Sequence, residues 1–306
     1  MTLSARHAAI SHVGRQRPGN EDAYLVRPPL YAVADGMGGA RAGEVASEMA
    51  VAALAELLAE PPLDDQTAAA RLAEAAAEAN SRIHSAASAD AARSGMGTTL
   101  TALLLRDDHA LLAHIGDSRA YLLRGDKLTQ LTQDHSLVAE MVRDGRLAAD
   151  EARLHPYRSI LSRALGTEPD AEVDELRVDL LAGDVLLLCS DGLSGPVPLD
   201  KLRKGLAAGD PEKAARRLVD EALRHGGPDN VTVVVVQLLD GAAGGESDAT
   251  ETLVLPAEEP DRDSAPDPQE AAAGDAEAVA DPLRRRHWPW SRRSGASRAA
   301  APEADG

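Results

Sequence analysis

The sequence predicts a mixed α+β fold in which helices cover the outer faces of mostly antiparallel sheets. Short apolar runs bounded by Gly, Asp or Asn are typical of strands, and they lie at 24–26, 30–34, 99–105, 110–115, 120–123, 185–189 and 231–238. Ala/Glu/Leu-rich segments of helical period lie at 44–59, 67–87 and 211–223. The first two helical segments follow each other and precede three strands. This order disfavours a parallel doubly wound sheet, in which strands and helices alternate.

Two further segments complete the predicted elements. Residues 124–127 contain Gly and Asp and separate a strand that ends at Leu123 from one that begins at Leu128, which indicates a hairpin. Residues 134–166 are less periodic, with a short helical pattern at 136–143. A connection of this length between strands is usually functional or mobile.

Composition limits the class of protein. The chain has 306 residues and a formal net charge of −18, which fits one domain of about 240 residues followed by a tail and argues against nucleic acid as the main partner. No apolar run approaches the roughly 18 residues that cross a bilayer, and no secretory signal is recognisable, so we expect a cytoplasmic protein without a transmembrane segment. The single cysteine, Cys189, lies in an apolar run and should be a buried thiol.

Aspartate recurs at the ends of the strand-like runs, each time beside a small or turn-forming residue. The five segments concerned are 20–22, 34–39, 115–119, 189–192 and 228–232. One such aspartate is typical of a turn. If the fold gathers the strand ends at one edge, however, carboxylate oxygens converge with almost no soft ligand among them. Mg²⁺ or Mn²⁺ requires that ligand composition, and such a cluster would repel itself without a cation.

These motifs resemble, in order and spacing, those of a metal-dependent (type 2C) serine/threonine protein phosphatase. The resemblance includes Arg17 and Gly97-Thr98-Thr99, runs from about residue 5 to about residue 238, and is greatest to the bacterial branch that opposes membrane-bound serine/threonine kinases. It implies a four-layer αββα sandwich, with two mostly antiparallel sheets flanked by helix pairs. Residues 1–240 would form the catalytic domain, and residues of about 136–166 a flap beside the catalytic face.

The resemblance also implies a set of metal ligands for two Mn²⁺ or Mg²⁺ ions. Asp35 would bridge the ions, the Gly36 carbonyl would bind one of them, and Asp191 and Asp229 would bind the other. A glycine suits position 36 because no Cβ obstructs the approach of its carbonyl to an ion.

Four more residues match positions around those ions. Glu21 and Asp22 would contact the ions through water, and Asp117 would form a third, weaker metal position together with Asp191. Arg17 matches the arginine that grips the substrate phosphate, and a guanidinium can bind two phosphate oxygens at once. Asn230, beside a ligand position, is expected to fix its loop by hydrogen bonds.

One position departs from the animal members of the family. They carry a histidine, proposed to protonate the leaving group, where this chain has Met37. Methionine cannot donate a proton, so a water or another residue must serve as the general acid. Many bacterial relatives share the methionine. His135 is the histidine to test, and a structural role is the alternative for it.

The leading hypothesis is a phosphatase that removes phosphate from serine and threonine of proteins, with a serine/threonine kinase and its substrates as partners. One alternative is a catalytically silent phosphoprotein-binding pseudophosphatase. Another is a phosphatase of an anti-sigma-factor antagonist. The lone cysteine does not lie in a phosphate-cradling Cys-x₅-Arg loop, which excludes a cysteine phosphatase.

Residues 241–306 change abruptly to Gly, Ala, Glu, Asp and Pro, so a disordered tail is expected. Residues 284–293 hold both tryptophans among five arginines, which indicates a solvated basic patch or a docking motif for an anionic partner or membrane surface. Thr252, followed three residues later by Leu255, resembles the phosphothreonine motif read by forkhead-associated domains. The alternative is a linker whose residues 253–255 pack on the domain.

Overall fold

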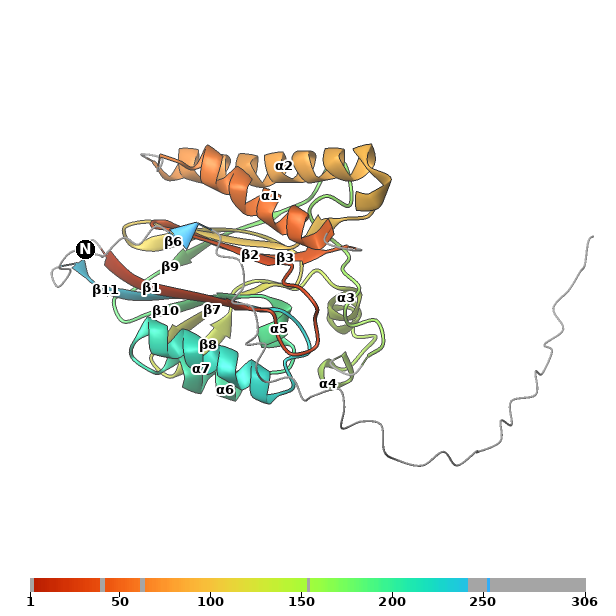
Figure 1. Cartoon of the computed structure of the whole chain (residues 1–306). Coiled ribbons are helices and arrows are strands. Elements are labelled where there is room, and N and C mark those ends of the chain that lie inside the picture. Colours follow the sequence, from red (N-terminus) through yellow and green to blue (C-terminus); the bar gives the residue numbers. More distant parts are fainter. Residues whose placement is uncertain (1–2, 39–41, 61–63, 153–154, 242–251, 254–306) are drawn as a thin grey trace, which may run out of the picture. The chain divides into compact units, whose positions relative to one another are not determined.

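Two antiparallel sheets lie face to face between two layers of helices, with α1 and α2 on one side and α6 and α7 on the other (Figure 1). The computed structural model describes residues 3–38, 42–60, 64–152, 155–241 and 252–253. The arrangement confirms the predicted four-layer sandwich. The basic patch at 284–293 and almost all of the predicted tail lie outside the described residues.

The first sheet has the strand order β1-β11-β10-β7-β8. Its strands are β1 (Leu3–His12), β7 (Arg119–Arg124), β8 (Lys127–Gln130), β10 (Val185–Cys189) and β11 (Val231–Asp240). Helices α6 (Leu199–Leu206) and α7 (Pro211–Arg224) cover its outer face, and the short helix α5 (Asp191–Ser194) follows β10. The predicted hairpin between β7 and β8 is present, with Arg124 paired to Lys127.

The second sheet has the order β12-β2-β3-β5-β6-β9, and β4 adds to one end of β3. Its strands are β2 (Asp22–Arg27), β3 (Leu30–Met37), β4 (Gly97–Thr98), β5 (Leu100–Leu105), β6 (His109–Ile115), β9 (Asp174–Asp179) and β12 (Thr252–Leu253). Helices α1 (Ala42–Leu57) and α2 (Asp65–Ala89) cover its outer face, and a 3₁₀ turn (Ala91–Arg93) follows α2.

The helices begin where capping side chains satisfy their first N–H groups. The carboxylate of Asp64 accepts a hydrogen bond from the Thr67 N–H at the start of α2, and Asp210 does the same for Lys213 at the start of α7. Pro211 occupies the first turn of α7, where a missing N–H costs nothing. Each cap therefore sets the point at which its helix begins to cover a sheet.

Three aliphatic layers hold the sandwich together. Leu54 and Leu72 pack from the helices onto Leu104 of the second sheet. Tyr31 and Val234 belong to the layer between the two sheets, and a third layer lies beneath α6 and α7. Burial of this aliphatic surface is the main force that brings the ends of the two sheets together.

Strands β1 and β9 were not predicted from the sequence. Along β1 every residue is only partly buried except Arg6, which is exposed, and alanines alternate with polar residues, so the apolar signal is weak. Strand β9 is an edge strand with only two apolar residues, Leu176 and Val178, among four charged ones. Strand β12 lies beyond residue 240 and pairs Thr252 with Val26 at the edge of the second sheet.

The segment between β8 and β9 carries α3 (Leu137–Arg143) and α4 (Ala149–Ala152), in agreement with the short helix predicted at 136–143. A backbone bridge joins Ser136 to Leu161, and another joins Leu165 to Thr98 of β4. The segment is therefore attached at its base to the second sheet. No helix in the described part of the chain is long and apolar enough to cross a membrane.

Candidate metal centre

Carboxylates from both sheets face one another at one end of the sandwich. Asp22 of β2 and Asp35 of β3 are register partners in an antiparallel pair, so their side chains leave the same face. Asp191 opens α5 directly after β10, and Asp229 lies just before β11. Asp117 follows β6. Each sits where a strand begins or ends, as the sequence predicted.

Asp22 reaches from the second sheet to the first. Its Oδ2 accepts a hydrogen bond of 2.8 Å from the Ser190 hydroxyl, and Thr232 provides another hydrogen bond. Its Oδ1 is buried and has no hydrogen-bond partner among the described residues. Burial, together with the charges of Asp191 and Asp229, raises the pKa of Asp22 to about 7, although the two hydroxyl groups oppose the shift.

Asp35 lies at the centre of the carboxylate group. Burial raises its pKa well above the usual value, and the charges of Asp22, Asp191, Asp117 and Asp229 raise it further, in that order. The backbone of Asp35 is held by the Gly97-Thr98-Thr99 motif. The Asp35 N–H donates to the Thr99 hydroxyl at 2.9 Å, and both the Thr98 hydroxyl and the Thr99 N–H donate to the Asp35 carbonyl at 2.9 Å.

Asp191 and Asp117 form the other side of the group. Burial and the charge of Asp229 raise the pKa of Asp191 to about 6, while Arg119, Arg17 and a hydrogen bond from Asp35 oppose this.

Burial likewise raises the pKa of Asp117 to about 8, with further contributions from Asp191 and Asp134, while Arg119 opposes the shift. Four aspartates, 22, 35, 117 and 191, are therefore easier to protonate than aspartates in water. In such a group of carboxyl groups the ionised form is disfavoured, and a bound cation would stabilise that form.

Arg17 and Glu21 border the carboxylates on the solvent side. The Arg17 Nη2 lies 2.7 Å from Asp229 Oδ2, and the arginine side chain is 47 % exposed. This hydrogen bond raises the pKa of Arg17, so the group stays positively charged. Burial raises the pKa of Glu21, which lies close enough to Arg17 and Asp229 to interact with both charges.

Gly36 occupies a position at which no side chain fits. A Cβ there would lie 2.1 Å from the carbonyl oxygen of Gly43 in α1. A Cβ on Gly43 would in turn lie 2.9 Å from the carboxyl carbon of Glu21. The start of α1 therefore approaches β3 and Glu21 closely, and glycine at both positions makes that approach possible.

Asn230 fixes the loops that carry these groups, as expected from the sequence. Its amide nitrogen donates to the carbonyls of Val13 and Gly19 at 2.8 and 2.9 Å. Its oxygen accepts from the Glu21 N–H at 2.8 Å. Asn230 thereby ties the Arg17 loop and Glu21 to the residue that follows Asp229.

His135 is held at both ring nitrogens. Its Nδ1 accepts from the Gly116 N–H at 3.1 Å, and its Nε2 lies 3.2 Å from Asp174 Oδ2. The side chain is 1 % exposed. The ring is therefore part of the protein interior, which supports the structural role and not that of a general acid.

Four polar residues that bear on the carboxylates were not assigned a role from the sequence: Thr99, Asp134, Ser190 and Thr232. Ser190 and Thr232 lie inside the motifs that carry Asp191 and Asp229. The sequence therefore indicated that they lie near the site, but it did not predict which residues they contact. Asp134 is brought near the carboxylates by the tertiary fold, and no pattern in the surrounding sequence predicts that position.

The donor set fits hard divalent cations. The residues that face one another offer carboxylate oxygens, among them the unpaired Asp22 Oδ1, and Cys189 is buried in the apolar layer beneath α6 and α7. In the described part of the chain, no three His, Cys, Asp or Glu side chains form a finished metal-binding cluster. Arg17 is instead paired with Asp229, and Asp35 with Asp191.

The sequence profile of the family Protein phosphatase 2C matches residues 11–241. The chain belongs to the protein phosphatase 2C family.

Two similar proteins, one of them also known as a solved domain, place the chain among bacterial members. Serine/threonine protein phosphatase PstP of Mycobacterium tuberculosis is 44 % identical over 270 residues, which cover 84 % of this chain and 51 % of PstP. Serine/threonine phosphatase stp of Listeria innocua is 41 % identical over 232 residues, which cover 73 % of this chain and 92 % of stp. The solved catalytic domain of PstP in complex with two manganese ions superposes with a TM-score of 0.73 at 44 % identity, covering 78 % of this chain and 100 % of that domain. The chain thus spans about half the length of full PstP.

Proposed function

We propose that this protein hydrolyses phosphoserine and phosphothreonine in other proteins with the help of divalent metal ions. The observation that carries the proposal is the convergence of Asp22, Asp35, Asp117, Asp191 and Asp229, whose charges interact in a buried space between two sheets. Similarity to bacterial serine/threonine phosphatases, one of them solved with two manganese ions, supports it.

The ligand assignment follows the family pattern. Asp35, the Gly36 carbonyl, Asp191 and Asp229 would hold two ions. Glu21 and Asp22 would act through water, which agrees with the unpaired Asp22 Oδ1. We assign a third, weaker ion to Asp117 and Asp191, and we propose Mn²⁺ or Mg²⁺ at all three positions.

When bound, such ions would supply positive charge for the phosphoryl oxygens and would lower the pKa of a water toward about 7, which would make that water a nucleophile. The residues of the chain bind and orient the substrate phosphate. Arg17 is half exposed beside Asp229, so its guanidinium can leave that carboxylate and grip two oxygens of the incoming phosphate. Met37 cannot donate a proton and His135 has both nitrogens in use, so the proton for the leaving serine or threonine oxygen must come from a water or another residue.

We further propose that a serine/threonine kinase and its phosphorylated substrates are the partners, and that the protein acts in the cytoplasm. Residues 1–240 are the proposed catalytic domain, and residues of about 136–166 a flap that contacts the substrate. The attachment of this segment to Thr98, next to the residues that hold Asp35, supports a place beside the centre. No specific contact favours a catalytically silent binding module or a role in an anti-sigma-factor pathway. Each position at which the family pattern has an acidic ligand holds aspartate or glutamate in this chain.

We also propose a partner for the segment after the domain. Thr252, once phosphorylated, would dock to a forkhead-associated domain. In the structure Thr252 pairs with Val26 at the edge of the second sheet, so the segment must leave that edge before a kinase or a binding domain can reach it.

The decisive experiment for the activity uses a phosphothreonine peptide and detects released phosphate with malachite green. Wild type with Mn²⁺ should release phosphate, whereas wild type with a chelator and Asp191→Ala with Mn²⁺ should not. Activity that survives chelation would overturn the metal-dependent mechanism.

A further inference from the structure

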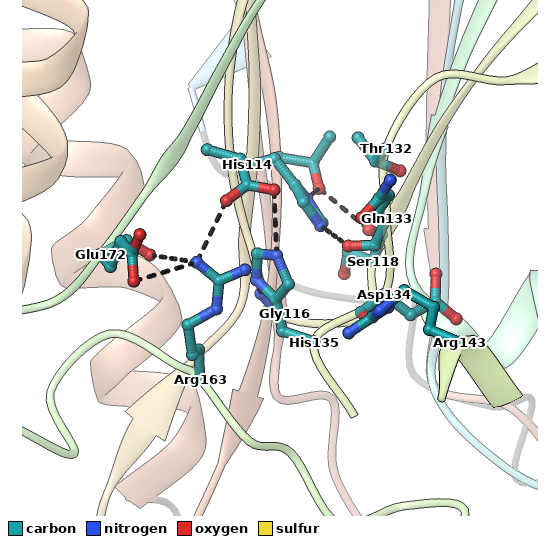
Figure 2. A network of polar contacts seen from close by, with 12 residues as sticks. His114, Gly116, Ser118, Thr132, Gln133, Asp134, His135, Arg143, Arg163 and Glu172 are labelled. Atoms are coloured by element: carbon teal, nitrogen blue, oxygen red, sulfur yellow. Dashed lines mark hydrogen bonds and ion pairs between the residues drawn. The ribbon is translucent and has the colours of Figure 1, made fainter. Parts of the chain in front are cut away.

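Two adjacent residues, Asp134 and His135, hold the turn that carries Asp117 from both of its ends. Figure 2 labels both residues near Gly116, at the first end of this turn. On one side the Gly116 N–H donates to His135 Nδ1 at 3.1 Å, and the His135 N–H donates to the Gly116 carbonyl at 2.8 Å. On the other side Arg119 donates to the carboxylate of Asp134, with its Nε at 2.9 Å and its Nη2 at 2.6 Å. The Asp134-His135 dipeptide therefore clamps the turn 116–119.

The hydrogen bonds fix the tautomer of His135. A backbone N–H can only donate, so Nδ1 must accept and carries no proton. The proton of the neutral ring is then on Nε2, which faces Asp174 Oδ2 at 3.2 Å. Arg163 Nη1 holds the other oxygen of Asp174 at 3.1 Å. The chain Arg163, Asp174, His135 and Gly116 thus sets which ring nitrogen meets the turn.

Gly116 can be fixed only through its backbone. Its φ is +105°, and a Cβ would lie 2.5 Å from Thr99 Cγ2, so no side chain is tolerated. A glycine with this freedom would leave the direction of the next residue loosely defined. The two hydrogen bonds to His135 remove that freedom immediately before Asp117.

We propose that His135 is a positioning residue that aims the Asp117 carboxylate at the weaker cation position shared with Asp191. The inference rests on the proposed function, because that position is part of the assigned metal centre. His135 acts through the Gly116 peptide and touches neither the ion nor the substrate.

The same dipeptide is an anchor of the proposed flap. Arg163 near the end of the flap binds Asp174, Arg143 Nη1 donates to the Asp134 carbonyl at 3.0 Å, and the Ser162 N–H donates to the His135 carbonyl at 2.9 Å. Both ends of the segment therefore meet the residues that hold the Asp117 turn.

The test separates the two hydrogen bonds of the ring. In His135→Gln the amide nitrogen can replace Nε2 and keep the bond to Asp174, while the bond from Gly116 is lost. In His135→Asn the amide oxygen can replace Nδ1 and rescue the bond from Gly116, while the bond to Asp174 is lost. Calorimetric titration of the full chain with Mn²⁺ reports the binding events directly. We expect His135→Gln to weaken the weakest event by about tenfold, as removal of an outer contact to a metal ligand does, and His135→Asn to restore most of it.

A double mutant tests whether the effect passes through Asp117. Asp117→Asn with His135→Gln should bind Mn²⁺ no more weakly than Asp117→Asn alone, because a residue that acts only through Asp117 has nothing left to position. Additive losses would overturn the proposal. So would unchanged Mn²⁺ binding in His135→Gln at a lowered melting temperature, which would make the ring a packing residue only.

If His135→Gln does not fold, Asp174→Ala gives a milder perturbation. It leaves the imidazole ring in place but removes the carboxylate that keeps the ring proton on Nε2. We then expect weakening of the same binding event by about threefold, a part of the outer-contact effect, and no weakening would overturn the proposal. Failure of the wild type to bind Mn²⁺ or to hydrolyse a phosphothreonine peptide is a different outcome, which would overturn the proposed function itself.

Discussion

Asp22 and Asp35 occupy directly opposed positions in the antiparallel pair of β2 and β3. Like charges at such a position destabilise a sheet, because the two side chains leave the same face at short range. Here the destabilisation is increased by burial and by Asp191 on the opposite sheet. In the metal-free fold these aspartates therefore repel one another. Bound cations would attract the same carboxylates and so offset the repulsion.

The first prediction concerns Asp35→Asn and Asp229→Asn. Each change removes a proposed ligand charge, so turnover of a phosphothreonine peptide should fall by about a thousandfold or more, which corresponds to about 4 kcal/mol of lost transition-state stabilisation. In a chelator, Asp35→Asn should melt a few degrees higher than wild type, since loss of one repelling charge releases roughly 1 kcal/mol. Malachite-green assays and thermal melts check both results.

Asp126→Asn is the matched control for these variants. Asp126 is fully exposed in the β7–β8 turn, at the opposite end of β7 from Asp117. Its activity and melting temperature should equal those of wild type. Asp35→Asn with substantial remaining activity would show that the ligand assignment is wrong.

Arg17→Ala should behave differently from the ligand variants. The guanidinium binds phosphate in both the ground state and the transition state, so its loss should raise KM by about tenfold with a smaller effect on kcat. Arg17→Lys should recover only part of the affinity, because an ammonium cannot make the paired contact. Steady-state kinetics decide the point, and a loss confined to kcat would contradict a phosphate-binding role.

A third prediction concerns pH and His114, whose pKa is lowered to about 4 by burial and by the neighbouring His135. Its Nε2 lies 2.9 Å from the Gln133 carbonyl, so the neutral ring donates there. The unfolded chain binds a proton below about 6.5 and the folded chain only below about 4, so the unfolded state holds more protons in that window. This histidine therefore lowers the free energy of unfolding as pH falls from 6.5 to 4, by at most about 3 kcal/mol.

Urea denaturation in a chelator at pH 4.5 and pH 7 measures the effect. His114→Gln keeps a donor for Gln133 but cannot titrate, so its unfolding free energy should decrease less between the two pH values than that of wild type. Comparison of the two proteins is essential, because the aspartates with raised pKa values act in the opposite direction. An equal pH dependence in both proteins would show that His114 is protonated in the folded state.

The fourth prediction concerns the flap. Replacing residues 145–158 by a short Gly/Ser linker keeps α3 and the bridge between Ser136 and Leu161. Because only the outer part is lost, kcat/KM for p-nitrophenyl phosphate should stay within about twofold, whereas kcat/KM values should change unequally among phosphoproteins. Kinetics on the small substrate and two phosphoproteins check this. Equal losses on all substrates would mean that the segment supports the metal centre.

Helices on the outer faces of mostly antiparallel sheets could be predicted from local signals, whereas the four-layer arrangement and the ligand set were implied by the resemblance to the phosphatase family. Apolar runs marked β3, β10 and β11, and the aspartates follow or precede those runs directly. The strand ends meet because the sheets pack through their aliphatic faces. The expectation that Asp35 and Asp191 would lie close together depended in addition on the resemblance to the phosphatase family.

Contacts that cross the fold could not be predicted in this way. The bond from Ser190 to Asp22 joins residues that are 168 positions apart, and it depends on the offset between two sheets. The clamp of His135 on Gly116 depends on the path of a segment with no periodic pattern. Strand β12 has only two residues, too few for any alternation to be read.

The final prediction concerns Thr252, which resembles the threonine of a forkhead-associated recognition motif. Its backbone pairs with Val26 at the sheet edge, and a phosphate adds about −2 charge and three acceptor oxygens. Phosphorylation should therefore hold the segment away from β2 and make it available to a forkhead-associated domain. Asp35→Asn, which cannot remove its own phosphate, should be incubated with a serine/threonine kinase and its phosphosites mapped by mass spectrometry. Binding to the domain should appear after phosphorylation, survive Thr250→Ala and disappear in Thr252→Ala. The idea fails if Thr252 acquires no phosphate, or if the phosphorylated chain and its Thr252→Ala variant bind the domain equally.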